Sequence, residues 1–178
     1  MKLSTYNKSD IGEIQQLFLA VFSDSEGKEE GLLIGSLVLD LVTGTEDQNI
    51  YGFIATENDQ IIGSIFFTRL EFETTDNAFI LSPVAIHTKH QGKGVGQDLI
   101  NFGIKHLKDY GIGLAFTYGD PNFYSKVGFE CISEEIAKAP LKMSQPEGWL
   151  CQSLTGDEIK PIAGKSRCVD ALNNPEYW

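Results

Sequence analysis

Cysteine is scarce in this chain of 178 residues, and the three cysteines, Cys131, Cys151 and Cys168, are widely spaced. They form no Cys-x-x-Cys pair, and no pair of histidines stands near enough to complete a zinc site. An odd number of cysteines at such spacing is typical of reduced thiols in or near a core, where free cysteine behaves as a small hydrophobe. The sequence therefore predicts no metal site.

Long apolar runs are missing as well. No window reaches the roughly 18 uninterrupted apolar residues that a membrane helix needs, and Met1–Tyr6 lacks the apolar stretch of a signal peptide. We therefore expect a soluble, cytoplasmic protein with no membrane partner. The length suits one domain, with a core over 1–155 and an irregular extension over 156–178 that contains Pro161, Gly164 and Pro175.

Basic residues are few in comparison with acidic ones. Lys and Arg number 14 against 25 Asp and Glu, so the formal net charge is −11. A nucleic-acid binder normally gathers Lys and Arg into a patch, so nucleic acid is not an expected partner. An acidic surface attracts cationic substrates such as amines, although it also serves solubility.

The hydrophobic pattern predicts two helices followed by an antiparallel run of strands. Apolar residues recur at helical spacing from Ile11 to Phe22; residues 23–31 are polar and predict a loop, and 32–42 predict a second helix. Expected strands cover 2–6, 50–56, 61–72, 78–86, 112–118 and 149–154. A helix is expected from Val95 to Leu107, and a brief one carries Phe123–Tyr124 and ends at Gly128. Three antiparallel strands after two helices exclude a simple alternating βαβ array.

The central motif is the loop Gln91-Gly92-Lys93-Gly94-Val95-Gly96, which follows a predicted strand and opens a predicted helix. Glycine lets an anion approach the backbone closely, and the amides of such a loop and helix N-terminus point at that anion. Lys93 adds a positive charge. The chemistry indicates a site for phosphate or pyrophosphate.

Two other phosphate loops do not fit this segment. A Walker loop needs Gly-Lys-Ser or Gly-Lys-Thr after four spacer residues, which Gly92-Lys93-Gly94 does not supply. The dinucleotide fingerprint needs a third glycine at the position that Gln97 occupies. A glycine-rich turn without a ligand stays open on this motif alone.

The wider context resembles the GNAT superfamily of acetyltransferases. The segment Gln91–Gly96 fits the family's Gln/Arg-x-x-Gly-x-Gly/Ala loop, Val84-Ala85-Ile86 stands where the family has its pantetheine-pairing strand, and Phe123-Tyr124-Ser125-Lys126-Val127-Gly128-Phe129 resembles its Phe-Tyr-x-Lys-x-Gly-Phe element. Asp10-Ile11 and Gly119-Asp120-Pro121 look like one predicted-acetyltransferase branch. The resemblance is strong over Leu81–Glu130, fair over Lys2–Arg69 and weak after Lys138.

The resemblance implies an α+β fold, the acyl-CoA N-acyltransferase fold of this superfamily, with a mixed, mostly antiparallel sheet that splays at its centre and flanking helices. Pantetheine would bond the backbone around Val84, Ala85 and Ile86 like an added strand, and the pyrophosphate would lie on the amides of Gln91, Gly92, Lys93, Gly94, Val95 and Gly96. Lys126 is a further candidate for the coenzyme phosphates. The implied reaction is direct attack of a primary amine on acetyl-coenzyme A (acetyl-CoA) in a ternary complex.

Tyr124 matches the family's position for the general acid that protonates the leaving thiolate, and a phenol is close in acidity to an alkyl thiol. Simple packing is the alternative role for such an aromatic side chain. The general base is not assigned; the candidates are Glu26, Glu29, Glu30, Glu71, Glu73, His87 and His90.

Two other functions remain open at this stage. One is a non-catalytic acyl-CoA-binding sensor or interaction module on the same fold; the other is a different nucleotide-binding protein, against which the Phe123–Phe129 element argues. A homodimer is compatible with the resemblance, because the C-terminal strand of such folds often joins dimers. The amine acceptor is not readable from the sequence.

Overall fold

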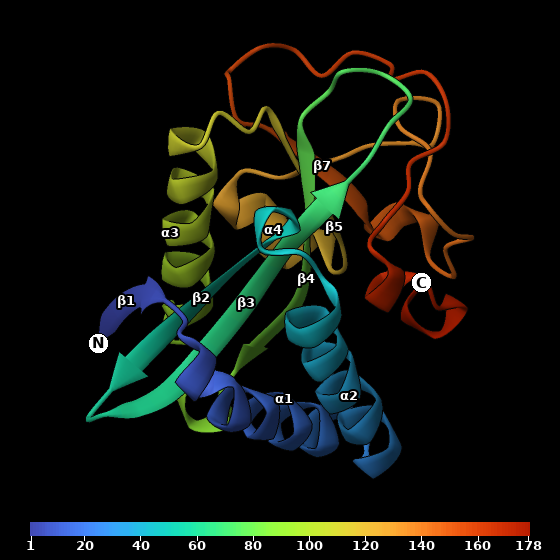
Figure 1. The fold of residues 1–178 in the computed structure, drawn as a ribbon. Coiled ribbons are helices and arrows are strands. Elements are labelled where there is room, and N and C mark those ends of the chain that lie inside the picture. Colours follow the sequence, from blue (N-terminus) through green and yellow to red (C-terminus); the bar gives the residue numbers. More distant parts are fainter. The chain divides into compact units, whose positions relative to one another are not determined.

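The computed structural model describes all 178 residues. Seven strands form one open, mixed sheet in the order β1-β2-β3-β4-β5-β7-β6, accompanied by four α-helices (Figure 1). The bounds are β1 Lys2–Thr5, α1 Ile11–Glu26, α2 Lys28–Gly44, β2 Ile50–Glu57, β3 Gln60–Leu70, β4 Ala78–Ile86, α3 Val95–Asp109, β5 Leu114–Tyr118, α4 Pro121–Tyr124, β6 Glu130–Cys131 and β7 Trp149–Ser153. This is the α+β fold that the sequence predicted.

The chain divides into two compact units. The first comprises residues 1–67 and 83–103, and the second comprises 68–82 and 104–178. The chain passes from one unit to the other within β3, β4 and α3. The expectation of one domain with an extension from residue 156 stays a prediction, and each unit is described by itself.

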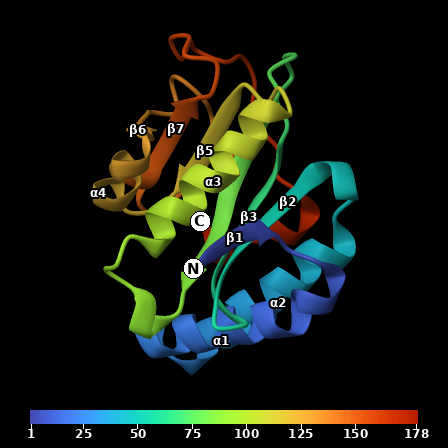
Figure 2. The same ribbon diagram turned by 90° about the vertical axis from the view of Figure 1, so that its left-hand side faces the viewer.

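In the first unit, α1 and α2 pack side by side (Figures 1 and 2). Their apolar stripes are buried, and the Phe18 ring lies 6.1 Å from Phe66 of β3. The neighbouring strand β2 presents Phe53 to α3, where its ring centre lies 5.7 Å from that of Phe102. The two strands therefore have helices on opposite faces, which explains why β2 and β3 read as almost continuous apolar runs.

The predicted loop over 23–31 is wrong. α1 continues to Glu26 and α2 already begins at Lys28, with only Gly27, at φ +106°, between them. The helices approach closely at Gly31, where a Cβ atom would overlap the Ser23 hydroxyl. The polar residues here are exposed ends of helices, not a loop, because packing along the rest of each stripe holds both ends helical.

In the second unit, β5 pairs with β4 in parallel and with β7 antiparallel, and β6 pairs with the far edge of β7 (Figure 2). The parallel register joins Ala78–Leu81 to Leu114–Thr117 and ends there, although β4 continues to Ile86. The centre of this unit is the Trp149 ring, which stacks on Phe116 at 5.2 Å and donates its indole N–H to the Ala137 carbonyl at 2.9 Å.

The segment after Gly156 is mostly irregular, as the sequence predicted, but its end is packed. Two short 3-10 turns cover Asp170–Leu172 and Pro175–Tyr177. Trp178 then stacks on Tyr118 at 5.9 Å and donates its indole N–H to the Leu172 carbonyl at 3.0 Å. A buried tryptophan removes a large apolar surface from water and stabilises a fold, so the end of this tail is part of the packing of the second unit.

None of the helices is both long enough and apolar enough to cross a membrane.

Cys151, on β7, provides a test of the packing. The thiol is fully buried, and this burial raises its pKa to about 12, with the Glu130 charge adding and a backbone hydrogen bond from Gln152 opposing. The folded protein therefore keeps a proton that the unfolded chain releases near the ordinary thiol pKa of 9.0. The Cys151 contribution to stability is complete below about pH 9 and is lost as the pH rises toward about 12.

We predict that the free energy of unfolding falls by up to about 1.4 kcal/mol per pH unit in this window because of Cys151 alone. Denaturant unfolding of wild type and Cys151→Ala at several pH values measures this slope, and the variant should be less pH-dependent. Cys131→Ala, which removes an exposed thiol, is the matched control. Parallel curves for wild type and Cys151→Ala would contradict the prediction.

Candidate functional site

The predicted coenzyme loop lies in the first unit and follows directly from β4. Val84 and Ile86 are half-buried and Ala85 is buried at the end of this strand. A 3-10 turn over Thr88–His90 then leads to Gln91, whose side-chain amide donates to the Ile86 carbonyl at 2.9 Å. Gln91 thus ties the start of the loop to the end of the strand.

Gly92 and Gly94 have φ of +71° and +85°. No atom lies within 4 Å of the Cβ position at either glycine, so the requirement for glycine comes from the backbone conformation and not from crowding. Gly96 has no positive φ and lies in the first turn of α3. The two left-handed residues turn the chain sharply on an exposed surface immediately before a helix N-terminus.

The first backbone N–H groups of α3 have no acceptor within the helix. The first bond in its hydrogen-bond ladder runs from the Asp98 N–H to the Gly94 carbonyl at 3.0 Å. The N–H groups of Val95, Gly96 and Gln97 therefore come before it, as in any helix N-terminus. Val95 is buried and anchors the turn, whereas Lys93 is exposed. Such an arrangement favours an anion, through both the free amides and the helix dipole.

Tyr124 lies in the second unit, in the segment that follows β5. Asp120 caps α4, because its carboxylate accepts from the Asn122 N–H at 2.9 Å, and Pro121 occupies the first turn. The segment ends at Gly128, which has φ of +90° and whose added Cβ would lie 2.6 Å from the Gln152 amide. The brief helix ending at Gly128 is as predicted.

Close contacts hold the Tyr124 ring. It lies over Gly119, where a Cβ would be only 2.7 Å from a ring carbon, and it packs edge-on against Phe129 at 5.8 Å. Although part of the residue stays exposed, burial raises the pKa of the phenol above 10.0; hydrogen bonding from Thr117 opposes this and the Asp120 charge adds to it. The phenol therefore keeps its proton at neutral pH, as a proton donor must.

The remaining candidate for the coenzyme phosphates, Lys126, is exposed in the turn after α4.

The candidates for the general base are distributed over both units. His87 accepts a hydrogen bond from the Lys89 N–H at 3.2 Å, and His90 lies 3.8 Å from the Glu57 carboxylate. Glu71 forms an ion pair with Arg167 at 3.2 Å. Glu73 lies against Gly164, Glu26 ends α1, and Glu29 and Glu30 lie in the first turn of α2. These placements do not single out any of the seven residues as the general base.

Thr117 is a residue that sequence reasoning missed. It lies on β5 and is fully buried, and its hydroxyl donates to the Leu81 carbonyl at 3.0 Å. In the sequence it is one β-branched residue in a short apolar strand, so no local signal distinguishes it.

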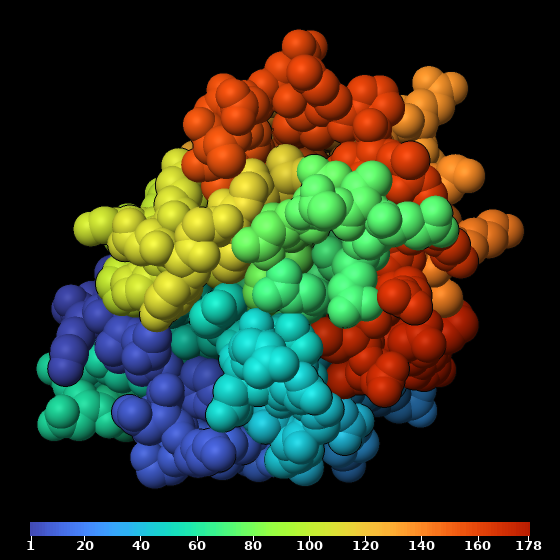
Figure 3. All heavy atoms as spheres, turned by 45° about the horizontal axis from the view of Figure 1, so that its top comes forward, coloured from blue at the N-terminus to red at the C-terminus, as the bar shows by residue number.

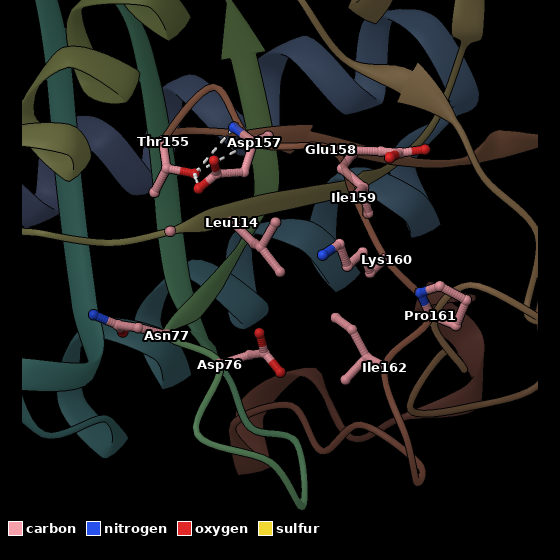
Figure 4. Close-up of a pocket in the computed structure, with 12 residues that line it drawn as sticks. Asp76, Asn77, Leu114, Thr155, Asp157, Glu158, Ile159, Lys160, Pro161 and Ile162 are labelled. Atoms are coloured by element: carbon pink, nitrogen blue, oxygen red, sulfur yellow. Dashed lines mark hydrogen bonds between the residues drawn. The ribbon is translucent and has the colours of Figure 1, made fainter.

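One pocket of about 590 Å³ lies within the second unit. It is lined by the residues just before β4, the start of β5, the end of β7 and the segment over 155–162. Figure 3 shows the red-orange segment near residue 160 on the surface of the molecule, next to the green segment before β4. Figure 4 shows the Lys160 ammonium directed toward Leu114, while the Glu158 carboxylate points away and Asp157 bonds to Thr155 at 2.8 Å. Acidic residues outnumber the single lysine in this lining, which disfavours phosphate. The pocket lies where the pairing of β4 with β5 begins, at Ala78 and Leu114, and not at its other end, at Leu81 and Thr117.

Comparison with known proteins gives the family. Residues 48–131 match the model described as acetyltransferase (GNAT) domain. The chain is 31% identical over 170 residues to an uncharacterized N-acetyltransferase of Escherichia coli K12, YjhQ, and the match covers 92% of this chain and 90% of that protein. A second E. coli protein, the uncharacterized N-acetyltransferase YhbS, is 32% identical over 81 residues, 44% of this chain and 48% of its own length. The chain belongs to the GNAT superfamily of N-acetyltransferases.

Solved structures share the fold. The crystal structure of E. coli YhbS in complex with CoA superposes with a TM-score of 0.83 at 23% identity, covering 97% of this chain and 92% of that one. A GNAT acetyltransferase from Brucella melitensis in complex with acetyl-CoA gives a TM-score of 0.77 at 21% identity, covering 97% of each chain. These likenesses extend beyond the region of the domain match to nearly the whole chain.

The glycine conformations generate a prediction for the loop. Gly94→Val places a branched residue where φ is +85°, so the loop must change its path and its amides turn away from a bound anion. We expect the affinity for acetyl-CoA to fall by at least about tenfold, about 1.4 kcal/mol, with the fold retained because the loop is exposed. Isothermal titration measures the affinity.

Gly12→Ala is the matched control, because Gly12 lies in α1 with a negative φ and open space around its Cβ position. It should bind the coenzyme as the wild type does. A folded Gly94→Val variant with wild-type affinity would show that this loop does not hold the phosphates.

Proposed function

We propose that this protein transfers the acetyl group of acetyl-CoA to a primary amine, by direct attack of the amine on the thioester in a ternary complex. The observation that carries the proposal is the turn at Gly92 and Gly94 with the open amides of α3 after it, a place suited to a pyrophosphate. The relatives support it, since YhbS was crystallised with CoA and the Brucella protein with acetyl-CoA. The cytoplasmic location and a homodimer stay predictions.

The coenzyme is assigned to residues of the first unit. The backbone of Val84, Ala85 and Ile86 pairs with pantetheine, and the amides from Gln91 to Gly96 hold the pyrophosphate. The expected role of Lys126, an exposed cation of the second unit, toward the phosphates stays a prediction. Acetyl-CoA supplies the activated acyl group, and these residues bind and orient it.

Tyr124 is the proposed general acid. A free alkylamine has a pKa near about 10.4 and attacks only in its neutral form. As the tetrahedral intermediate collapses, the C–S bond breaks and the thiolate takes the phenol proton; the tyrosinate then recovers a proton that the acylated nitrogen releases. Because burial raises the pKa of Tyr124 above 10.0, the phenol is still protonated at pH values where part of an alkylamine is already neutral.

Coenzyme specificity tests the assignment of the loop. Isothermal titration should show that acetyl-CoA binds much more tightly than NAD or ATP. ATP binding as tight as that of acetyl-CoA would overturn the proposal. Tight acetyl-CoA binding without acetylation of any member of a broad amine panel would instead favour a non-catalytic acyl-CoA sensor.

Tyr124→Phe tests the acid. The variant keeps the ring contacts with Gly119 and Phe129 and loses only the hydroxyl, so acetyl-CoA affinity should be unchanged. General-acid assistance is worth about 10²–10⁴-fold, and we expect the single-turnover rate to fall within that range. In wild type, the alkaline decline of this rate should begin only above the ordinary phenol pKa of 10.0, because burial raises it. Equal single-turnover rates would reduce Tyr124 to a packing role.

A further inference from the structure

The Thr117 hydroxyl has one proton and two neighbours that compete for it. A hydroxyl has one donor and two acceptor sites. A carbonyl only accepts, so the bond to the Leu81 oxygen at 3.0 Å uses the Thr117 proton. Toward the Tyr124 phenol, the same hydroxyl then offers only a lone pair. Both neighbours belong to the second unit, as Thr117 itself does.

The Tyr124 ring lies on the same side of the chain as the Thr117 hydroxyl, so the acceptor that this hydroxyl bonds affects the phenol. The Gly119 N–H bonds to the Gly148 carbonyl at 2.9 Å, which continues the pairing of β5 with β7 past Tyr118. Residues two apart on such an extended chain point to the same face, and the Tyr124 ring lies over Gly119, two residues beyond Thr117. Thr117 is fully buried, and although part of Tyr124 stays exposed, burial raises the pKa of its phenol. A hydrogen-bond donor at the phenol oxygen therefore stabilises a tyrosinate formed here.

We propose that Thr117 is a positioning residue for proton transfer, which turns its hydroxyl from the Leu81 carbonyl to the Tyr124 oxygen when that oxygen becomes an anion. The inference rests on the proposed acid role of Tyr124. The proton that reaches the thiolate is that of Tyr124; Thr117 keeps its own proton throughout and only changes its acceptor. When Tyr124 is protonated again, the hydroxyl returns to Leu81.

The effect of Thr117 on the pKa of Tyr124 has the sign that the proposal requires. Hydrogen bonding from Thr117 lowers the pKa of Tyr124, against the larger effect of burial, as a donor to the anionic form must. Thr117→Val keeps a β-branched side chain and removes this donor. The pKa of Tyr124 should therefore rise further in the variant, and proton donation should become harder.

The kinetic experiment compares single-turnover acetylation in wild type, Thr117→Val, Thr117→Ser, Tyr124→Phe and the Thr117→Val/Tyr124→Phe double variant. Thr117→Val should lower the rate about tenfold, the effect of one hydrogen bond to a charged group, with unchanged affinity for acetyl-CoA. Thr117→Ser should recover most of the rate. In the Tyr124→Phe background, Thr117→Val should have no further effect.

A second readout needs no amine. In protein labelled with ¹³C at the tyrosine ζ-carbon, the Tyr124 signal is assigned by its loss in Tyr124→Phe and then titrated. It should titrate higher in Thr117→Val than in wild type. Thr68→Val is the matched control, because Thr68 is another fully buried hydroxyl of the second unit but has no hydrogen-bond partner; it should leave the Tyr124 titration unchanged.

The outcomes separate the two proposals. If Tyr124→Phe slows the reaction and Thr117→Val does not, the inference about Thr117 is wrong and the acid stands. If Thr117→Val slows both backgrounds equally, the residue only supports the strands and the inference is wrong. If Tyr124→Phe changes nothing, the acid role itself fails. An unchanged Tyr124 titration in folded Thr117→Val overturns the inference in every case.

Discussion

The hydrogen bond from Thr117 to the Leu81 carbonyl stands at the point where β4 and β5 stop pairing. Their parallel register ends with these two residues, and beyond it the backbone groups of a strand need other partners. A side-chain hydroxyl at this point secures the end of the ladder. The same residue faces Tyr124, so the end of the sheet pairing and the proposed proton donor depend on one buried group.

Much of the coenzyme loop was predictable because its requirements are local. A strand, a polar turn with two glycines and a helix follow one another directly within residues 78–109, and glycine is the residue that tolerates positive φ. Gly92 and Gly94 have such φ values and Gly96 does not, so two of the three glycines carry the backbone argument. The roles of these residues toward a coenzyme stay a proposal.

The failures have a different physical origin, because they depend on packing between neighbouring elements and not on the local residue pattern. The predicted loop over 23–31 is helical on both sides of Gly27, and what permits this is the close approach of Ser23 to Gly31 across two helices. Thr117 bonds to a carbonyl 36 residues earlier. No periodicity or motif encodes either contact, and composition misleads in the first case because exposed helix ends are as polar as loops.

The segment from Thr117 to Phe129 is held in shape by hydrogen bonds between residues that are close together in the sequence. Asp120 caps its helix, the Gly128 N–H bonds to the Ser125 carbonyl, and the Phe129 N–H bonds to the Tyr124 carbonyl at 3.2 Å. The reach from Thr117 to Tyr124 is therefore set by the number of residues between them. An insertion or deletion between Thr117 and Tyr124 would move the phenol away from the Thr117 hydroxyl. Related proteins that share this arrangement should therefore keep the length of the segment from Thr117 to Phe129 and vary in length after Cys131, where the chain leaves β6.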